Sequence, residues 1–107
     1  MHLLMITFQL NGISEADYLA RNKEDATLLA RFPGLYSKVQ LADAAANTYG
    51  GMYLWKDERA MEAFAHSDIV KAIAARPYLT NFSIKDYDIE EERSHVTWSI
   101  VTWHALA

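Results

Sequence analysis

The chain has 107 residues, of which 51% are hydrophobic and 22% charged, which is the composition of one globular domain with a single core over residues 1–107. The formal net charge is −4 and the basic residues are scattered, which argues against a nucleic-acid partner because phosphate binding needs clustered lysine and arginine. The chain has no cysteine, which excludes disulfides, thiolate catalysis and cysteine metal sites and fits a cytoplasmic protein.

The first third of the chain predicts a strand followed by a helix. Residues 3–10 form an apolar run that the Asn11-Gly12 turn signal ends. Ser14 begins a capping box, so we expect a helix from Glu15 to about Arg31, which Pro33 and Gly34 terminate. The expected buried side of this helix comprises Tyr18, Leu19, Ala26, Leu29 and Ala30.

The middle of the chain predicts two strands joined by a loop. Residues 35–41 alternate between two sets of side chains, which is strand periodicity, and residues 42–47 are small and loosely specified. Residues 48–56 then form a strand rich in aromatic side chains. Its Gly50-Gly51 pair permits close approach of another backbone or of a ligand.

The last part of the chain predicts a helix and a strand. Asp57 offers an N-cap for the helix, which can restart at Ser67 and which the Arg76-Pro77 pair ends. Residues 79–89 follow as a strand, and a tail from Ser94 to Trp103 also favours a strand. The order β-α-β-β-α-β predicts an α+β, ferredoxin-like domain with an antiparallel sheet, both helices on one sheet face and an extra C-terminal strand or tail.

The aromatic strand has two faces with different chemistry. Met52 and Leu54 suit the face that the helices cover, which places Tyr49, Tyr53 and Trp55 on the opposite face. Because large exposed apolar patches usually contact a partner or ligand, this arrangement predicts a homodimer that pairs sheet face to sheet face. Three side chains of the preceding strand could join the aromatic set: Tyr36, Lys38 and Gln40.

The reverse orientation of the strand remains open, since periodicity does not say which set of side chains meets the helices. The aromatic side chains would then line a cavity between sheet and helices. Such a cavity is a natural site for a small aromatic ligand, because ligand pockets are mostly apolar with a few polar groups.

Several of these pieces together resemble the YdhR-like monooxygenases of the dimeric α+β barrel superfamily. The resemblance spans residues 3–94, and two features depart from it: residues 91–93 lack the family's Pro-Leu, and the longer tail carries two tryptophans, Trp98 and Trp103. The matching pieces are Leu3-Leu4 with Phe8, Asn11 and Gly12; Pro33-Gly34 with Lys38-Val39; the segment from Gly50 to Glu58 with Ala60; and, more loosely, Asp88 and Ser94.

The resemblance implies a ferredoxin-like protomer, a sheet-to-sheet dimer and cofactor-independent oxygenation of electron-rich aromatic compounds such as hydroquinones. A haem-degrading branch of the same superfamily uses an Asn, a Trp and a His. The corresponding positions here are Thr7, Phe64 and Ala74, so haem degradation is not expected.

His66 is the strongest candidate for a catalytic group. It lies near the expected break in the second helix, and a histidine with a near-neutral pKa could accept a phenol proton. Its structural alternative is an exposed residue in the last turn of a helix, where it complements the helix dipole.

The candidate substrate-binding residues also have structural alternatives. Tyr36, Tyr49 and Tyr53 could donate hydrogen bonds to a substrate oxygen, but such tyrosines more often pack with their hydroxyls at a rim. Trp55 could stack on an aromatic ligand, although packing at an interface is commoner. Asn11 could orient a carbonyl group, but Gly12 beside it favours a turn.

The sequence predicts no metal and no cofactor. Its histidines lack metal-ligand spacing, and it contains no phosphate loop, nucleophile elbow or nucleotide-binding motif. No apolar run approaches the length of a membrane span. The predicted function is therefore cofactor-free oxygenation of a small quinol-type compound. The alternatives are a non-catalytic dimer that binds a small ligand and a cofactor-free isomerase or cyclase.

Overall fold

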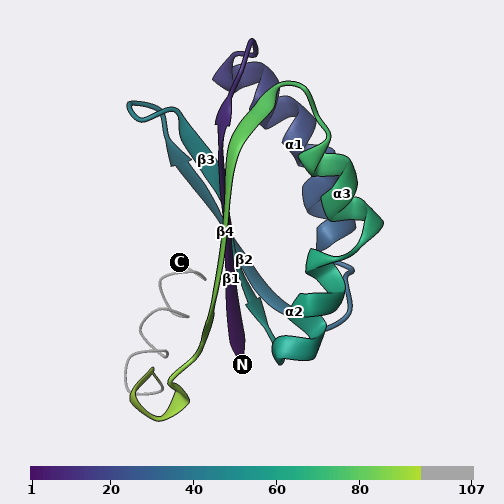
Figure 1. The fold of residues 1–107 in the computed structure, drawn as a ribbon, viewed down its shortest axis with the longest axis vertical. Coiled ribbons are helices and arrows are strands. Elements are labelled where there is room, and N and C mark those ends of the chain that lie inside the picture. The colour runs from purple at the N-terminus through teal and green to yellow at the C-terminus, as the bar shows by residue number, and fades with distance from the viewer. Residues whose placement is uncertain (95–107) are drawn as a thin grey trace.

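The computed structural model describes residues 1–94, and the predicted tail strand lies outside the described residues. Four antiparallel strands form one open sheet in the order β2-β3-β1-β4. Three helices lie together on one side of this sheet (Figure 1). The predicted ferredoxin-like α+β architecture is confirmed. The elements in chain order are β1 (His2–Leu10), α1 (Glu15–Leu29), β2 (Leu35–Asp43), β3 (Thr48–Trp55), α2 (Glu58–Ala65), α3 (Asp68–Ala74) and β4 (Leu79–Asp88).

The helices begin at the residues whose side chains cap them. Ser14 Oγ accepts a hydrogen bond from the Asp17 amide at the start of α1, and Asp57 Oδ1 accepts one from the Ala60 amide at the start of α2. Ser67 caps α3 through the Val70 amide and also donates to the carbonyl of Phe64. These caps satisfy amides that have no partner within their own helix. The predicted break near Ser67 therefore separates two short helices.

The sheet register decides which side chains meet the helices. Across β1 and β3, Leu4 pairs with Tyr53 and His2 pairs with Trp55, and all four side chains are buried. Paired residues share a sheet face, so the large aromatic side chains of β3 face the helices. The expectation that Met52 and Leu54 would face the helices is wrong, and the reverse orientation of the strand is correct.

The physical reason is that the large aromatic rings remove more apolar surface from water when they face the helices than Met52 and Leu54 would. The Trp55 ring packs against Phe32 and Phe64, with ring centroids 5.8 and 4.9 Å away, and no part of Trp55 is exposed. The Tyr53 ring lies 5.2 Å from that of Phe64. A tryptophan or tyrosine buries 150–250 Å². Burial of these rings therefore outweighs burial of Met52 and Leu54.

Two adjacent glycines allow the chain to take this path. Gly50 has φ of +150°, and a Cβ atom at this position would lie 1.9 Å from the carbonyl oxygen of Ile6. A Cβ atom at Gly51 would lie 3.0 Å from Cε of Lys38 and 3.1 Å from the Tyr53 ring. Gly50 thus lets β3 approach β1, and Gly51 leaves room for two side chains above the sheet.

The other sheet face has apolar side chains at its centre, with Lys85 beside Met5 on β4. Met5 pairs with Met52, and Met52 also pairs with Val39, which is 54% exposed. Helices α1, α2 and α3 all lie on the opposite side of the sheet from this face (Figure 1), and residues 91–94 form one helical turn after β4. The helices that the structure describes are also too short or too polar to cross a membrane.

Candidate functional site

A cavity of about 150 Å³ lies between the sheet and the helices. All four strands and all three helices contribute to its lining, which is mainly apolar. A mostly apolar, concave space with a few polar groups is typical of a small-ligand site. The aromatic side chains in its walls are Phe8, Tyr18, Tyr53, Phe64 and Phe82.

Helix α1 presents one stripe of side chains to this cavity. Tyr18, Asn22, Asp25 and Leu29 all line it, with the spacing of residues on one helix face. Tyr18 and Leu29 were predicted to be buried, whereas the same prediction for Leu19, Ala26 and Ala30 is wrong because these residues are exposed. Two of the four residues in this stripe are polar, so the positions of the apolar residues alone do not predict which face of α1 is buried.

An ion pair joins this stripe to the end of α3. Both terminal nitrogens of Arg76 donate to the carboxylate of Asp25, at 2.6 and 2.8 Å. These hydrogen bonds raise the pKa of Arg76, against the opposing effect of burial. The pair satisfies both charges, and its two-point geometry holds α1 against the connection that leads to β4.

Two tyrosine hydroxyls border the cavity, and both remain protonated at neutral pH. Burial raises the pKa of Tyr18 to about 12 and that of Tyr53 to about 12. The Tyr18 hydroxyl accepts a hydrogen bond of 3.2 Å from the side-chain amide of Gln40. Within residues 1–94 the structure gives the Tyr53 hydroxyl no hydrogen-bond partner, so it is available as a donor to a ligand.

Lys38 supplies an amine at the edge of the cavity. It lies on the edge strand β2 opposite Tyr53, and its Nζ atom is 5.3 Å from the centroid of the Tyr53 ring. Burial lowers the pKa of Lys38, and the nearby charge of Asp25 partly offsets this effect. Lys38 and Gln40 also line a shallow groove between α1 and β2, so they stand where this groove meets the cavity.

Of the residues predicted to bind substrate, only Tyr53 lines the cavity. Tyr49 is buried beside it, and its hydroxyl donates to the carboxylate of Glu15 at 2.8 Å, a contact that raises the pKa of Tyr49. Trp55 is wholly enclosed, and its Nε1 atom has no hydrogen-bond partner among the described residues. Tyr49 and Trp55 therefore pack against side chains that line the cavity and do not line it themselves.

The remaining predicted residues lie elsewhere. Asn11 follows β1, and its backbone amide donates to the backbone carbonyl of Tyr78, as expected for a turn residue. Tyr36 is 59% exposed and lines the shallow groove. The side chain of His66 is 79% exposed, lies within 3.1 Å of Glu62 and does not line the cavity. This position is that of an exposed residue at the end of a helix, while the catalytic role of His66 stays a prediction.

The sequence predictions group Lys38 and Gln40 with the aromatic side chains of the next strand but do not single out Asn22 and Asp25, which also line the cavity. Asn22 and Asp25 carry a usable signal, because they continue a helical stripe that begins at Tyr18. Lys38 and Gln40 alternate with apolar residues along β2, but alternation alone cannot say which set faces the helices. Only the register of β2 against β3 places them over the cavity.

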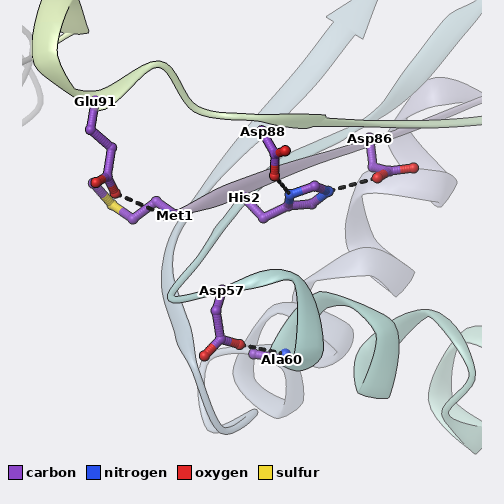
Figure 2. A network of polar contacts seen from close by, with 7 residues as sticks. All are labelled: Met1, His2, Asp57, Ala60, Asp86, Asp88 and Glu91. Carbon is purple, nitrogen blue, oxygen red and sulfur yellow. Dashed lines mark hydrogen bonds and ion pairs between the residues drawn. The ribbon is translucent and has the colours of Figure 1, made fainter.

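A second polar cluster lies at the far end of the sheet (Figure 2). The two ring nitrogens of His2 lie 2.8 Å from Asp88 and 2.6 Å from Asp86. Burial lowers the pKa of His2, but the two carboxylates outweigh this effect and raise it overall. His2, Glu58 and Asp86 could in principle hold a metal ion, since their ligand atoms lie within 4.8 Å of one another. Both His2 nitrogens already have partners, which is the geometry of an imidazolium between two carboxylates.

The sequence matches one protein-family model over residues 3–99, and that family is described as "Putative mono-oxygenase ydhR". The chain belongs to this family. The match covers β1 to β4 and therefore the whole cavity. No curated protein matches the sequence.

Solved structures with the same fold include three of known description. A protein from Deinococcus radiodurans, described as a putative antibiotic biosynthesis monooxygenase, has a TM-score of 0.71 at 17% identity, covering 85% of this chain and 94% of its own. SnoaB, a cofactor-independent oxygenase from Streptomyces nogalater, has a TM-score of 0.66 at 20% identity, with coverages of 84% and 93%. The haem degrader MhuD from Mycobacterium tuberculosis, with two haems bound, has a TM-score of 0.67 at 16% identity, with coverages of 84% and 96%. At these identities the likeness concerns the fold.

Proposed function

We propose that this member of the ydhR family is a homodimeric monooxygenase that oxidises a small electron-rich aromatic or quinol-type compound without a cofactor. The observation that carries the proposal is the cavity between sheet and helices, with aromatic walls and a few polar groups at its edge. Membership of a family described by monooxygenase activity supports the reaction type. The likeness of fold to a cofactor-independent oxygenase agrees with it.

In the proposed reaction the substrate itself supplies the electrons. The ionised form of a phenol transfers one electron to dioxygen, and the resulting radicals combine to form a carbon–oxygen bond. The ring hydroperoxide then loses water, so that one oxygen atom ends in a quinone carbonyl and the other in water. For a simple phenol, one phenol and one dioxygen give one quinone and one water, and no external reductant is consumed.

The cavity residues would assist this reaction in two ways. The apolar walls exclude water, which strengthens each electrostatic interaction within the cavity. The Tyr53 hydroxyl, held protonated by burial, would donate a hydrogen bond to an oxygen atom that gains negative charge.

Oxygen consumption by the purified protein with a panel of hydroquinones tests the proposal. We expect uptake of one dioxygen for each hydroxyquinone formed, with the second oxygen atom released as water and no hydrogen peroxide produced, and loss of this uptake when Ile73→Phe fills the cavity. Leu28→Phe is the matched control, because Leu28 is 60% exposed on α1 and does not line the cavity. Binding of the hydroquinones without oxygen uptake would instead support the non-catalytic alternative.

His66→Ala tests the proton-acceptor role predicted for His66. Because the side chain is 79% exposed and does not line the cavity, we expect turnover to stay within about twofold of the wild-type rate, a difference below about 0.5 kcal/mol in activation free energy. A loss of turnover with unchanged substrate binding would support the catalytic role.

A further inference from the structure

Lys38 differs from the other charged groups in the described cavity lining because no hydrogen bond or ion pair engages its amine. Arg76 and Asp25 neutralise each other through two hydrogen bonds. Within residues 1–94, by contrast, Lys38 has neither a hydrogen bond from its side chain nor an ion pair, although its side chain extends along the covered face of the sheet. An amine that is partly removed from water and makes no hydrogen bond or ion pair favours an anion beside it.

The protein backbone leaves a specific place for this amine. Because position 51 is a glycine, the Lys38 stem and the Tyr53 ring can lie side by side above the sheet, where a Cβ atom would crowd both. The Nζ atom reaches the face of the Tyr53 ring, at 5.3 Å from its centroid. Lys38 also lines both the cavity and the groove beside β2, so a ligand that enters from this groove passes the amine.

The size of the cavity limits the ligand that this amine can meet. An engineered protein cavity of about 150 Å³ binds benzene, and the cavity here has a volume of about 150 Å³. One aromatic ring therefore fits within the walls formed by Phe8, Phe64 and Phe82, whereas a polycyclic compound exceeds the space. The Tyr18 hydroxyl accepts from Gln40 and can still donate its own proton, and Asn22 also lines the cavity. Within the described lining, however, Lys38 is the cation that no carboxylate pairs, and the Tyr53 ring that carries a hydroxyl lies beside it.

We propose that the cavity binds a single-ring phenolate, with the phenolate oxygen at the Lys38 ammonium and the Tyr53 hydroxyl and the ring among the phenylalanine side chains. This binding mode adds a ligand class and a binding residue to the proposed function. One consequence rests on that function, namely that Lys38 selects the ionised form of the substrate, which is more readily oxidised. The binding itself can be measured without turnover.

The test uses 4-nitrophenol, whose phenolate has its own absorption band, and its neutral methyl ether, 4-nitroanisole. We expect the wild-type protein to bind the phenolate at least about tenfold more tightly than the ether, which corresponds to about 1.4 kcal/mol. Binding should also raise the phenolate fraction of a half-ionised solution. Lys38→Met should remove both effects while retaining binding of the ether, and Lys38→Arg should preserve the preference for the phenolate.

Two results would overturn the assignment. One is equal binding of phenolate and ether by the wild-type protein, a comparison that does not depend on any variant folding. The other is an unchanged phenolate preference in Lys38→Met. Phenolate binding without oxygen uptake would refute only the proposed oxygenase function. Oxygen uptake without phenolate preference would refute only the role of Lys38.

Discussion

At the scale of single residues, the two adjacent glycines of β3 lack a side chain for two different reasons. Gly50 and Gly51 are adjacent, but a Cβ atom would meet rigid backbone at the first and the end of a flexible side chain at the second. The first glycine is therefore required by the fold of the sheet. The second is required by the cavity, because it leaves room for Lys38 and Tyr53.

Alanine substitutions should separate these two purposes. Gly50→Ala places a Cβ atom 1.9 Å from the Ile6 carbonyl oxygen at a φ of +150°, so we expect a loss of roughly 3 kcal/mol or more in unfolding free energy. Gly51→Ala should cost below about 1 kcal/mol, because Lys38 can shift, but it should weaken phenolate binding. Urea denaturation and the 4-nitrophenol assay measure the two effects. Equal stability losses would contradict this distinction.

His2 makes stability depend on pH. The folded state raises the pKa of His2 through Asp86 and Asp88, so it binds the proton more tightly than the unfolded chain does. The resulting stabilisation is complete below the ordinary pKa of about 6.5. It is lost as the pH rises through the higher folded-state pKa.

Urea unfolding of wild type and of His2→Gln at several pH values checks this expectation. The difference in unfolding free energy between the two proteins should be largest below the ordinary pKa of about 6.5 and should narrow as the pH rises through the higher folded-state pKa of His2. Titration of the imidazole by NMR should show a pKa above the ordinary value. A difference that widens with rising pH would contradict the assignment of an imidazolium at this position.

At the scale of elements, short helices depend on their caps. Helix α2 spans only Glu58–Ala65 and α3 only Asp68–Ala74, which is below the length at which isolated helices are stable. Asp57 holds the first turn of α2 through a 2.8 Å hydrogen bond (Figure 2). Packing of Phe64 and Met61 onto the sheet then stabilises the helix that the cap begins.

Removal of the α2 cap should therefore destabilise the domain measurably. We expect Asp57→Ala to lower the unfolding free energy by about 1 kcal/mol. Asp68→Ala is a suitable control, since Asp68 follows the cap residue of α3 and its side chain makes no capping bond. The control should cost only a few tenths of a kcal/mol. Urea denaturation compares the two, and equal losses would show that the cap has no special role.

At the scale of the whole molecule, the sheet face opposite α1, α2 and α3 is the surface on which the proposed dimer rests (Figure 1). Met5, Met52 and Leu54 lie near the centre of this face, and Val39 and Tyr87 are about half exposed towards its edges. Contiguous apolar side chains on a protein surface often mark a contact with another protein. A second copy of the chain, paired face to face, would cover it and complete the dimer of the proposed function.

A single charge at the centre of this face should separate the proposed dimer. We expect the wild-type protein to elute as a dimer and Met52→Lys to elute as a folded monomer, because an unpaired ammonium group is costly in an apolar interface. Leu28→Lys, which adds the same charge on the exposed side of α1, should remain dimeric. Light scattering after gel filtration gives the mass, and a wild-type monomer would refute the dimer.

The order of the elements, the caps at Ser14, Asp57 and Ser67 and the family of the chain can all be predicted from the amino-acid sequence. These are local properties, because turn, cap and periodicity signals act over a few residues. Two features could not be predicted in this way: the aromatic rings of β3 face the helices, and Lys38 and Asp25 line one cavity. Both depend on strand register and on helix packing, which bring together residues that are distant in the sequence, and no local pattern records that juxtaposition.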